Sequence, residues 1–353
     1  MHVPRSVRDA GVGGKRVLVR ADLNVPLENG RVADDTRVRA SLPTLQLLLE
    51  RGATEVRVCS HLGRPNGLDP RFSIEPVRAR LRELLPEERI TVLENTRFDP
   101  RETKNDPDYA RELAAGCDLY VDDAFGSAHR AHAPTEAVAH LLPAYAGLLL
   151  EEELRQLGRL LGDVERPFAL ISGGAKVEDK LGVLEHLGGR ADTVLIGGKM
   201  AEQLREHNPL EFPVALPTDV VAASAFEEDA ESKVTPYDDV PDGWLGLDIG
   251  PQTRERFAKE IEVARTVFWN GPMGVFEWPR FAEGTKAVAQ AVAANERAFS
   301  VVGGADSVRA LNELGLGDEV SWVSTGGGAS LELLEGKELP SVAAIPAAVE
   351  SPA

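Results

Sequence analysis

Short apolar runs recur along the chain, and each run ends in glycine or in polar residues. The segments that follow the runs carry apolar residues at helical spacing. Continuous apolar strands that alternate with helices are typical of parallel sheets covered on both faces. The pattern therefore predicts an α/β fold. The runs fall at residues 16–22, 55–61, 90–95, 117–124, 168–174, 193–198, 266–271, 299–304 and 320–328.

The length of 353 residues exceeds what one hydrophobic core usually organises, roughly 250 to 300 residues. A boundary is predicted near residues 151–161, EEELRQLGRLL, where four leucines form one apolar helical stripe. An ordinary surface helix would show the same stripe, but the position between two sets of strands favours a connector. We expect two Rossmann-like three-layer αβα domains with parallel sheets joined by this helix. Their predicted extents are 1–150 with a C-terminal return at 338–353, and 151–337.

Two further segments of the second half read as short strands outside the main alternation. PVALP at residues 213–217 and LGLDIGP at residues 245–251 are predicted to form a small β excursion. We expect this excursion to lie within the second half.

The composition, 43% apolar and 27% charged, is that of an ordinary globular protein. The longest apolar stretch, LLPAYAGLLL, is shorter than the ~20 residues of a membrane-spanning helix. The first residues carry no apolar targeting segment, so we expect a cytoplasmic protein without a membrane partner. Cys59 and Cys117 lie in apolar runs without a C-x-x-C pattern, which favours reduced core thiols over a disulfide or a zinc site.

The net charge of −18 is unevenly distributed along the chain. Residues 1–150 hold 21 Lys and Arg against 22 Asp and Glu, whereas residues 151–353 hold 18 against 35. The acidic total argues against a nucleic-acid partner, which requires a basic face. Nineteen of the first 21 cations are arginines, whose planar guanidinium suits phosphate and carboxylate groups. A small anionic ligand in the first half fits this distribution.

Glycine pairs follow several predicted strands of the second half. Gly173-Gly174-Ala175-Lys176 comes after FALIS, and Lys180 lies four residues beyond Lys176. Glycines allow backbone N–H groups to approach an anion, and we expect the two lysines to share one helix face. A plain strand-to-helix turn with solvated lysines is the alternative for this segment alone. Further glycines at 197–198, 303–304 and 326–328 favour a polyphosphate site without a P-loop motif.

Asp306 follows the third of these glycine segments and is predicted to open a helix. It could act as a plain helix N-cap, which is a common role for aspartate. It is also the lone carboxylate among the glycine loops, and Mg²⁺ usually takes one or two carboxylates together with phosphate oxygens. We favour the Mg²⁺ hypothesis.

Polar and basic residues follow the predicted strands of the first half. Each arginine alone could form a surface salt bridge, but four at strand ends favour an anion cage. His129 and His132 could be loop donors rather than acid–base groups, and H-R-A-H lacks a third ligand for a metal. The candidate cage comprises Asp22, Asn24, Arg37, His61, Arg64, Arg97 and Arg130.

These segments together resemble the phosphoglycerate kinase family, over nearly the whole chain and in the family's order. The matching motifs are RADLNVP, SHLGRP, LENTRF, DAFGSAHRAH, LLEEEL, GGAKVEDK, LDIGP, WNGPMGVFE, GGADS and STGGGASLELLEG. The resemblance implies reversible phosphoryl transfer between 1,3-bisphosphoglycerate and MgADP, which gives 3-phosphoglycerate and MgATP. It also implies a monomer. Because the motifs are split between the two domains, we expect the domains to close around the substrates, with the helix at residues 151–161 as the hinge element.

The resemblance also assigns roles to individual residues. It implies that the seven cage residues hold the glycerate substrate, that Asp306 holds Mg²⁺, and that Glu277 contacts the ribose. Arg37, Lys176 and the N–H groups of the glycines, including Gly327, would stabilise the transferring group. The implied nucleotide site comprises Gly174, Ala175, Lys180, Gly198, Asn270, Pro272, Val275, Glu277, Ser307, Gly326, Gly327 and Gly328.

Two alternatives belong to other functional classes. A catalytically silent nucleotide-binding or scaffolding protein on the same fold would be expected to lack Arg37, Lys176 or Asp306, and all three are present. A nicotinamide dehydrogenase would require a G-x-G-x-x-G fingerprint, which does not occur in the sequence.

Overall fold

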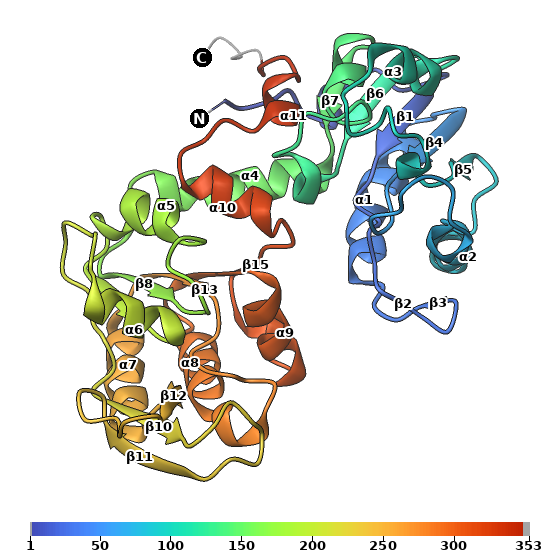
Figure 1. Cartoon of the computed structure of the whole chain (residues 1–353). Coiled ribbons are helices and arrows are strands. Elements are labelled where there is room, and N and C mark those ends of the chain that lie inside the picture. Colours follow the sequence, from blue (N-terminus) through green and yellow to red (C-terminus); the bar gives the residue numbers. More distant parts are fainter. Residues whose placement is uncertain (1, 349–353) are drawn as a thin grey trace. The chain divides into compact units, whose positions relative to one another are not determined.

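The computed structural model describes residues 2–348, and the predicted C-terminal return at 338–353 lies within the described residues only as far as 348. The chain divides into two compact units. The first unit contains the residues up to Arg155 and the segment that starts at Glu338, and the second is Gln156–Lys337. Each unit is built around its own five-stranded sheet (Figure 1).

The sheet of the first unit is parallel throughout, with the strand order β5-β4-β1-β6-β7. In β1, Val17 and Val19 join the core formed with the neighbouring helices, and Leu18 is buried on the other face. Burial on both faces explains why these strands are continuously apolar. The strands are β1 (Arg16–Arg20), β4 (Glu55–Cys59), β5 (Ile90–Val92), β6 (Leu119–Asp122) and β7 (Ala144–Ala146).

Helices connect the strands of this first sheet, and a short antiparallel hairpin follows β1. The C-terminal segment returns to this unit, where the N–H of Arg5 donates to the carbonyl oxygen of Pro346 at 2.9 Å. The helices are α1 (Thr36–Glu50), α2 (Glu75–Leu84), α3 (Pro107–Ala114) and α11 (Pro340–Ala343); the hairpin is β2 (Leu27–Glu28) and β3 (Arg31–Val32).

The sheet of the second unit is also parallel, with the order β15-β14-β13-β8-β9. Every residue of β8 and β13 is buried, and the core includes Trp269, Phe257 and Leu311. The strands are β8 (Phe168–Ser172), β9 (Thr193–Ile196), β13 (Thr266–Asn270), β14 (Phe299–Gly303) and β15 (Trp322–Val323). The helices are α5 (Leu181–Val183), α6 (Lys199–Glu206), α7 (Pro251–Val263), α8 (Glu283–Ala294), α9 (Ala305–Glu313) and α10 (Gly328–Leu334).

The small β excursion of the second unit differs in part from the prediction. It is an antiparallel sheet of β10 (Asp219–Ala223), β11 (Ser232–Pro236) and β12 (Leu245–Ile249), with β10 in the centre. LGLDIGP supplies β12 as expected. The assignment of PVALP was wrong, because only Ala215 of that segment makes an isolated bridge, to Leu195. Its two prolines lack the N–H group that a strand ladder requires.

The predicted connecting helix is α4 (Leu148–Leu161), which begins three residues earlier than expected. Of the four leucines in the predicted stripe, Leu154, Leu157 and Leu160 are buried and Leu161 is half-buried. The helix begins against a buried acid, because the N–H of Leu149 donates to Oδ1 of Asp123 at 2.9 Å. A carboxyl group at this position satisfies an N–H that the helix itself leaves free.

The two cysteines are free, as predicted, but only Cys59 belongs to the core. Cys117 is half-buried because it precedes β6 rather than lying inside the strand. Burial raises the pKa of both thiols, that of Cys59 to about 12.

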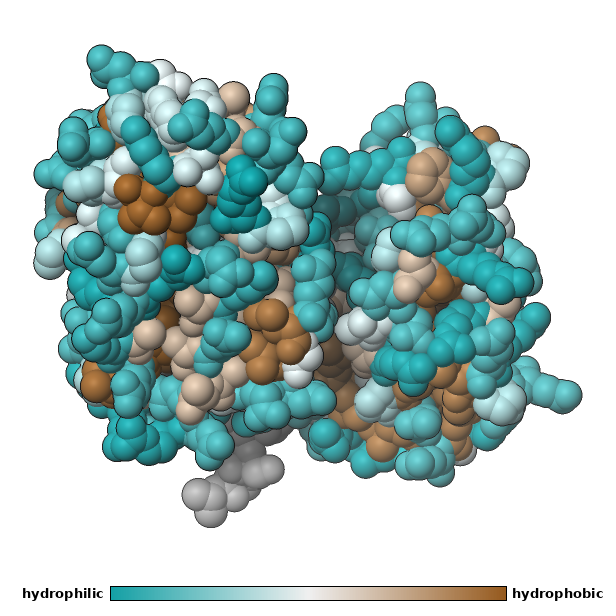
Figure 2. Space-filling view, turned by 90° about the horizontal axis from the view of Figure 1, so that it is seen from below, coloured by the Kyte–Doolittle hydropathy of each residue, from teal (hydrophilic) through white to brown (hydrophobic). Residues whose placement is uncertain are grey.

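The visible surface in Figure 2 is mostly hydrophilic, and apolar residues form small, separate patches. Among the described residues, no helix is both long enough and apolar enough to cross a membrane.

We expect Asp123 to make the chain less stable as the pH rises from 5 to 8. An aspartate in an unfolded chain has a pKa of about 4, whereas burial raises the pKa of Asp123 to about 8. Between these values the folded state holds a proton that the unfolded state lacks, so a rising pH favours unfolding. The contribution is complete below pH ~4 and is lost as the pH passes 8.

Calorimetry of wild type and Asp123→Asn at pH 5 and pH 8 tests this expectation. Asparagine is neutral in both states and keeps an oxygen for the N–H of Leu149. Between pH 5 and pH 8 the melting temperature should therefore fall less for the variant than for the wild type. The gap should be roughly 2–4 °C for each kcal/mol by which their losses of unfolding free energy differ. Asp122, whose pKa burial raises to about 6, is present in both proteins, and its charge is one of the causes that raise the pKa of Asp123. Equal losses would contradict the assignment.

Candidate active site

Each parallel sheet has one point at which its connections turn to opposite sides, and ligands bind at such points in α/β folds. In the first unit this point lies between β1 and β6, and in the second unit between β8 and β13. Asp22 and Asn24 follow β1, and the segment around Arg130 follows β6. Gly173 follows β8, and Asn270 ends β13. Residues predicted from the sequence therefore stand at both points.

The loop after β1 is bound to two other segments of the first unit. Nη1 of Arg37, on the first turn of α1, contacts Oδ2 of the buried Asp22 at 2.6 Å. The carbonyl oxygen of the Asn24 side chain accepts the N–H of Gly63 at 2.8 Å, in the loop after β4. These contacts fix the directions of two side chains that could meet an anion. Half of the Arg37 fork is thereby aligned before a ligand binds.

Arg20 is a site residue that the sequence reasoning missed. It is 1% exposed at the end of β1, and its Nη2 donates to Nδ1 of His61 at 2.8 Å. Because a guanidinium can only donate, Nδ1 of His61 must accept and its proton must lie on Nε2. Burial and then the charges of Arg20, Arg97, Arg130 and Arg37 hold the pKa of His61 well below its ordinary value. His61 is therefore a neutral ring with a fixed N–H donor.

Three of the four predicted arginines, Arg64, Arg97 and Arg130, line one hollow together with His132. Nη1 of Arg97 donates to the carbonyl oxygen of Gly63 at 2.9 Å, and Nε of Arg130 donates to Nε2 of His129 at 3.2 Å. His129 thus acts as an acceptor within the loop. Arg37 pairs with Asp22 instead of lining this hollow.

A second missed residue, Glu102, lies buried beside the hollow at 1% exposure. Its Oε2 lies 3.3 Å from Nε of Arg97, and its Oε1 lies 3.5 Å from Nδ1 of His132. Burial acts to raise the pKa of Glu102, but His132 and the charges of Arg20 and Arg97 hold it below its ordinary value. A fixed negative charge therefore orients two groups of the hollow.

The glycine loops of the second unit pack backbone against backbone. A Cβ at Gly173 would overlap the carbonyl oxygen of Pro272, so the loops after β8 and β13 could not approach each other. Gly198, the N-cap of α6, has a φ of 65°, and a Cβ there would lie 2.7 Å from the carbonyl oxygen of Gly174. Glycine is required at both positions, by close approach at the first and by the positive φ at the second.

The expected helix face shared by Lys176 and Lys180 was wrong. Residues 173–180 form a loop, and α5 begins only at Leu181. The loop takes its own hydrogen bonds, such as the N–H of Val177 to Oε1 of Gln203 at 2.9 Å. Lys176 is exposed, whereas Lys180 is half-buried and its Nζ donates to Oδ1 of Asn270. Burial lowers the pKa of Lys180, and the charges of Asp179 and Asp306 oppose that effect.

Asn270 offers a buried amide donor that has no partner within residues 2–348. The residue is 2% exposed, and its Nδ2 makes no hydrogen bond among the described residues. The next residue, Gly271, is bound to α9, since its N–H donates to Oγ of Ser307 at 2.6 Å. A buried donor without a partner is a costly feature that a ligand oxygen would relieve.

Asp306 lies in the first turn of α9, whose N-cap is Gly304, so the N-cap alternative was wrong. Its side chain is exposed, and within residues 2–348 no hydrogen bond or salt bridge engages the carboxylate. The other glycine segment is Gly326–Gly328, where Gly327 is the N-cap of α10. A carboxylate at a glycine-capped helix start is suited to a cation that is shared with phosphate oxygens.

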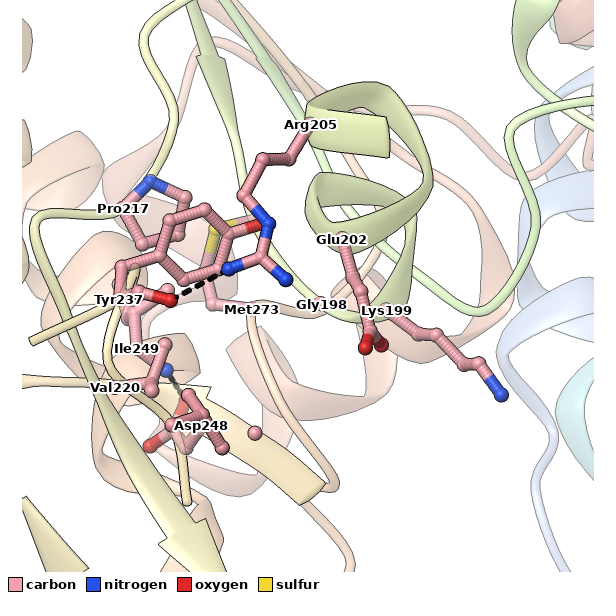
Figure 3. Close-up of a pocket in the computed structure, with 12 residues that line it drawn as sticks. Gly198, Lys199, Glu202, Arg205, Pro217, Val220, Tyr237, Asp248, Ile249 and Met273 are labelled. Carbon is pink, nitrogen blue, oxygen red and sulfur yellow. Dashed lines mark hydrogen bonds between the residues drawn. The ribbon is translucent and has the colours of Figure 1, made fainter. Parts of the chain in front are cut away.

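A pocket adjoins these loops on the side of α6 and β12 (Figure 3). Gly198 and Met273 line it, and Asp248 lies opposite Glu202 and Arg205 across the opening. Arg205 is held by Tyr237, since its Nη1 donates to the Tyr237 carbonyl oxygen at 2.8 Å. Of the predicted nucleotide residues, Gly198 alone belongs to this lining.

Val275 and Glu277 belong to the loop after β13, outside the lining of that pocket. The N–H of Val275 donates to the carbonyl oxygen of Leu247 at 2.8 Å, which binds the loop to β12. Glu277 is exposed on the same loop. Its carboxylate is therefore accessible to a polar group of a ligand.

The chain is similar to known proteins along nearly its whole length. The family model described as "Phosphoglycerate kinase" matches residues 7–212 and 203–337. The phosphoglycerate kinase of Rubrobacter xylanophilus is 52% identical, over 97% of this chain and 98% of its own, and that of Thermus thermophilus is 50% identical over 96% and 98%. The structure of phosphoglycerate kinase from Coxiella burnetii aligns with a TM-score of 0.86 at 36% identity, over 97% and 98% of the two chains. The chain therefore belongs to the phosphoglycerate kinase family.

Proposed function

We propose how the two units divide the reaction of this kinase, the reversible transfer of a phosphoryl group between 1,3-bisphosphoglycerate and ADP. The first unit would hold the phosphoglycerate and the second the nucleotide. The observation that supports this division is a difference in chemistry. Arginines from the loops after β4, β5 and β6 line one hollow of the first unit, whereas glycine loops follow the strands of the second unit.

In the first unit, the hollow of Arg64, Arg97 and Arg130 would receive the terminal phosphate of 3-phosphoglycerate. Guanidinium groups bind phosphate oxygens through paired, charge-assisted hydrogen bonds. The residues nearer β1 would hold the rest of the substrate: Asp22 and Asn24 accept from its hydroxyl group, and His61 donates through Nε2. Arg37 would face the carboxylate that accepts the phosphoryl group.

In the second unit, the loops after β8, β9 and β13 would hold ATP or ADP. Backbone N–H groups of Gly174, Ala175, Gly326 and Gly328 would face the phosphates, with Lys180, Asn270 and Ser307 beside them. We place the base in the pocket of Figure 3, reached past Gly198, Pro272 and Val275, and the ribose hydroxyls near the exposed Glu277.

Mg²⁺ fits the exposed carboxylate of Asp306, which no described side chain neutralises. When bound together with the nucleotide, the ion supplies positive charge to phosphate oxygens. Within residues 2–348 no cluster of three or more His, Cys, Asp or Glu could hold a metal, so the remaining ligands would come from phosphate and water.

The reaction requires no general base in the direction that consumes ATP. The acceptor is a carboxylate, which is already ionised at pH 7 because carboxyl pKa values lie near 3 to 4. His61 is correspondingly held neutral as a donor rather than placed to remove a proton. The task left to the protein is to align the reactants and neutralise the transferring group. Arg37, Lys176 and the N–H of Gly327 would do this.

We further propose that the chain works as a monomer in the cytoplasm, with small-molecule partners and neither nucleic acid nor membrane. The acidic net charge of −18 supports the absence of nucleic acid. A mass near 38.1 kDa by light scattering would agree with the monomer. No observation favours the silent scaffold or the dehydrogenase.

Asp306→Asn should abolish most of the Mg²⁺-dependent, 3-phosphoglycerate-dependent consumption of ATP. Because the ion's charge acts on the transferring group, we expect kcat to fall by about a hundredfold or more. Glu313→Gln, at the exposed end of the same helix, removes a comparable charge, which pairs with Arg309, and should leave the rate unchanged. Near-normal turnover of Asp306→Asn would reject the metal assignment.

Transfer requires the phosphate of one ligand to meet the acceptor of the other, so we propose that the units close when both ligands are bound. X-ray scattering should show a smaller radius of gyration with 3-phosphoglycerate and MgADP together than with either ligand alone. An unchanged radius under saturating ligands would refute closure.

A further inference from the structure

The buried carboxylate of Asp248 joins separate segments around the pocket of Figure 3. Its Oδ1 accepts the N–H of Ile249 in β12 at 2.9 Å, and its Oδ2 accepts the N–H of Gly284 in the first turn of α8 at 2.7 Å. The N-cap of α8, Ala282, has no side-chain oxygen to offer. Asp248 therefore caps this helix from a neighbouring strand.

The same carboxylate supports the loop after β13, which carries Pro272, Val275 and Glu277. A Cβ at Gly274 would overlap Oδ1 of Asp248, so the loop backbone lies directly against the carboxylate. A second bond binds this loop to α8, because the N–H of Met273 donates to Oγ1 of Thr285 at 3.0 Å. Movement of Asp248 would therefore shift both α8 and the loop.

Burying the carboxyl group of Asp248 has a desolvation cost that a purely structural role does not require. It is 3% exposed, and no described cation makes a salt bridge with it. Arg254 and Glu283 are the charged groups near it, and they lie 4.0 Å from each other. Burial raises the pKa of Asp248 to about 7. Acids whose pKa is strongly shifted by burial cluster at functional sites.

We propose that Asp248 is a positioning residue for the nucleotide: it sets the wall of the base pocket by holding α8 and the loop 271–277 against β12. The inference rests on the proposed function, since it takes the pocket to receive the base of a nucleoside di- or triphosphate. Asp248 acts through the loop and does not touch the reacting phosphates.

The second unit contains a matched control in Asp219. This residue is also 3% exposed, and it caps α7 in the same way: Oδ1 accepts the N–H of Thr253 at 2.8 Å, and Oδ2 accepts the N–H of Gln252 at 3.0 Å. A glycine, Gly250, packs against it as Gly274 packs against Asp248. Asp219 does not line the pocket. A purely structural role predicts the same behaviour for both residues.

The test compares Asp248→Asn with Asp219→Asn. The amide nitrogen of asparagine cannot accept a hydrogen bond, so each variant loses one backbone bond and should melt at a lower temperature. We expect the KM for MgATP to rise about tenfold in Asp248→Asn, because loss of one charge-assisted bond shifts the loop, while the KM for 3-phosphoglycerate stays unchanged. Asp219→Asn should leave both KM values unchanged. A KM for MgATP that stays within twofold in Asp248→Asn, or rises equally in Asp219→Asn, overturns the proposal.

Thr285→Val provides a second variant should Asp248→Asn fail to fold. It removes the acceptor for the N–H of Met273 on the same loop, so it should raise the KM for MgATP selectively. An unchanged KM for MgATP in this variant would also overturn the proposal. Failure of the proposed function would look different, because wild type would then show no turnover at all. In that case calorimetric titration of MgADP into both aspartate variants tests whether Asp248 positions the nucleotide. We expect weaker binding of MgADP in Asp248→Asn only.

Discussion

Parallel strands all end at the same edge of their sheet, and this constraint determines where the chemistry of the chain can lie. Loops far apart in sequence are brought together there, as Asp22 and Arg130 are beside β1 and β6. The second unit repeats the arrangement with different residues at β8 and β13. One architectural rule thus produces two binding sites, and the loop residues decide what each site holds.

In the proposed sites, the two units meet the charge of phosphate in different ways. The first unit uses arginines and restrains them with buried acids: Glu102 holds Arg97, and Asp22 holds Arg37. The second unit carries most of the net negative charge, so we propose that it relies on backbone N–H groups, two lysines and a carboxylate suited to Mg²⁺. Charged side chains aligned in advance lower the cost of ordering a ligand. The buried network of Arg20 and His61 serves the same purpose with a neutral ring.

Most of the fold could be predicted from the sequence, because a strand that is buried on both faces has to be continuously apolar. β7 was missed because Ala144–Ala146 is three residues long and lies inside a longer apolar stretch that looks like the start of a helix. The prediction that Lys176 and Lys180 share one helix face was wrong, because glycines and hydrogen-bonded backbone groups keep residues 173–180 in a loop. Arg20 could have been found from the sequence, as a charged residue within the apolar run RVLVRAD. Glu102 gave no such signal, since its partners Arg97 and His132 meet it only in the folded chain.

The measurement that tests the account most directly is hydroxylamine trapping of the product formed from 3-phosphoglycerate and MgATP. Hydroxylamine converts an acyl phosphate into a hydroxamate and releases phosphate, so it reports whether the phosphoryl group reached a carboxyl oxygen. The account predicts one hydroxamate for each ADP formed, and none when 3-phosphoglycerate is omitted. ADP formed without hydroxamate would show transfer to water or to another group and would contradict the assignment of the carboxylate as acceptor.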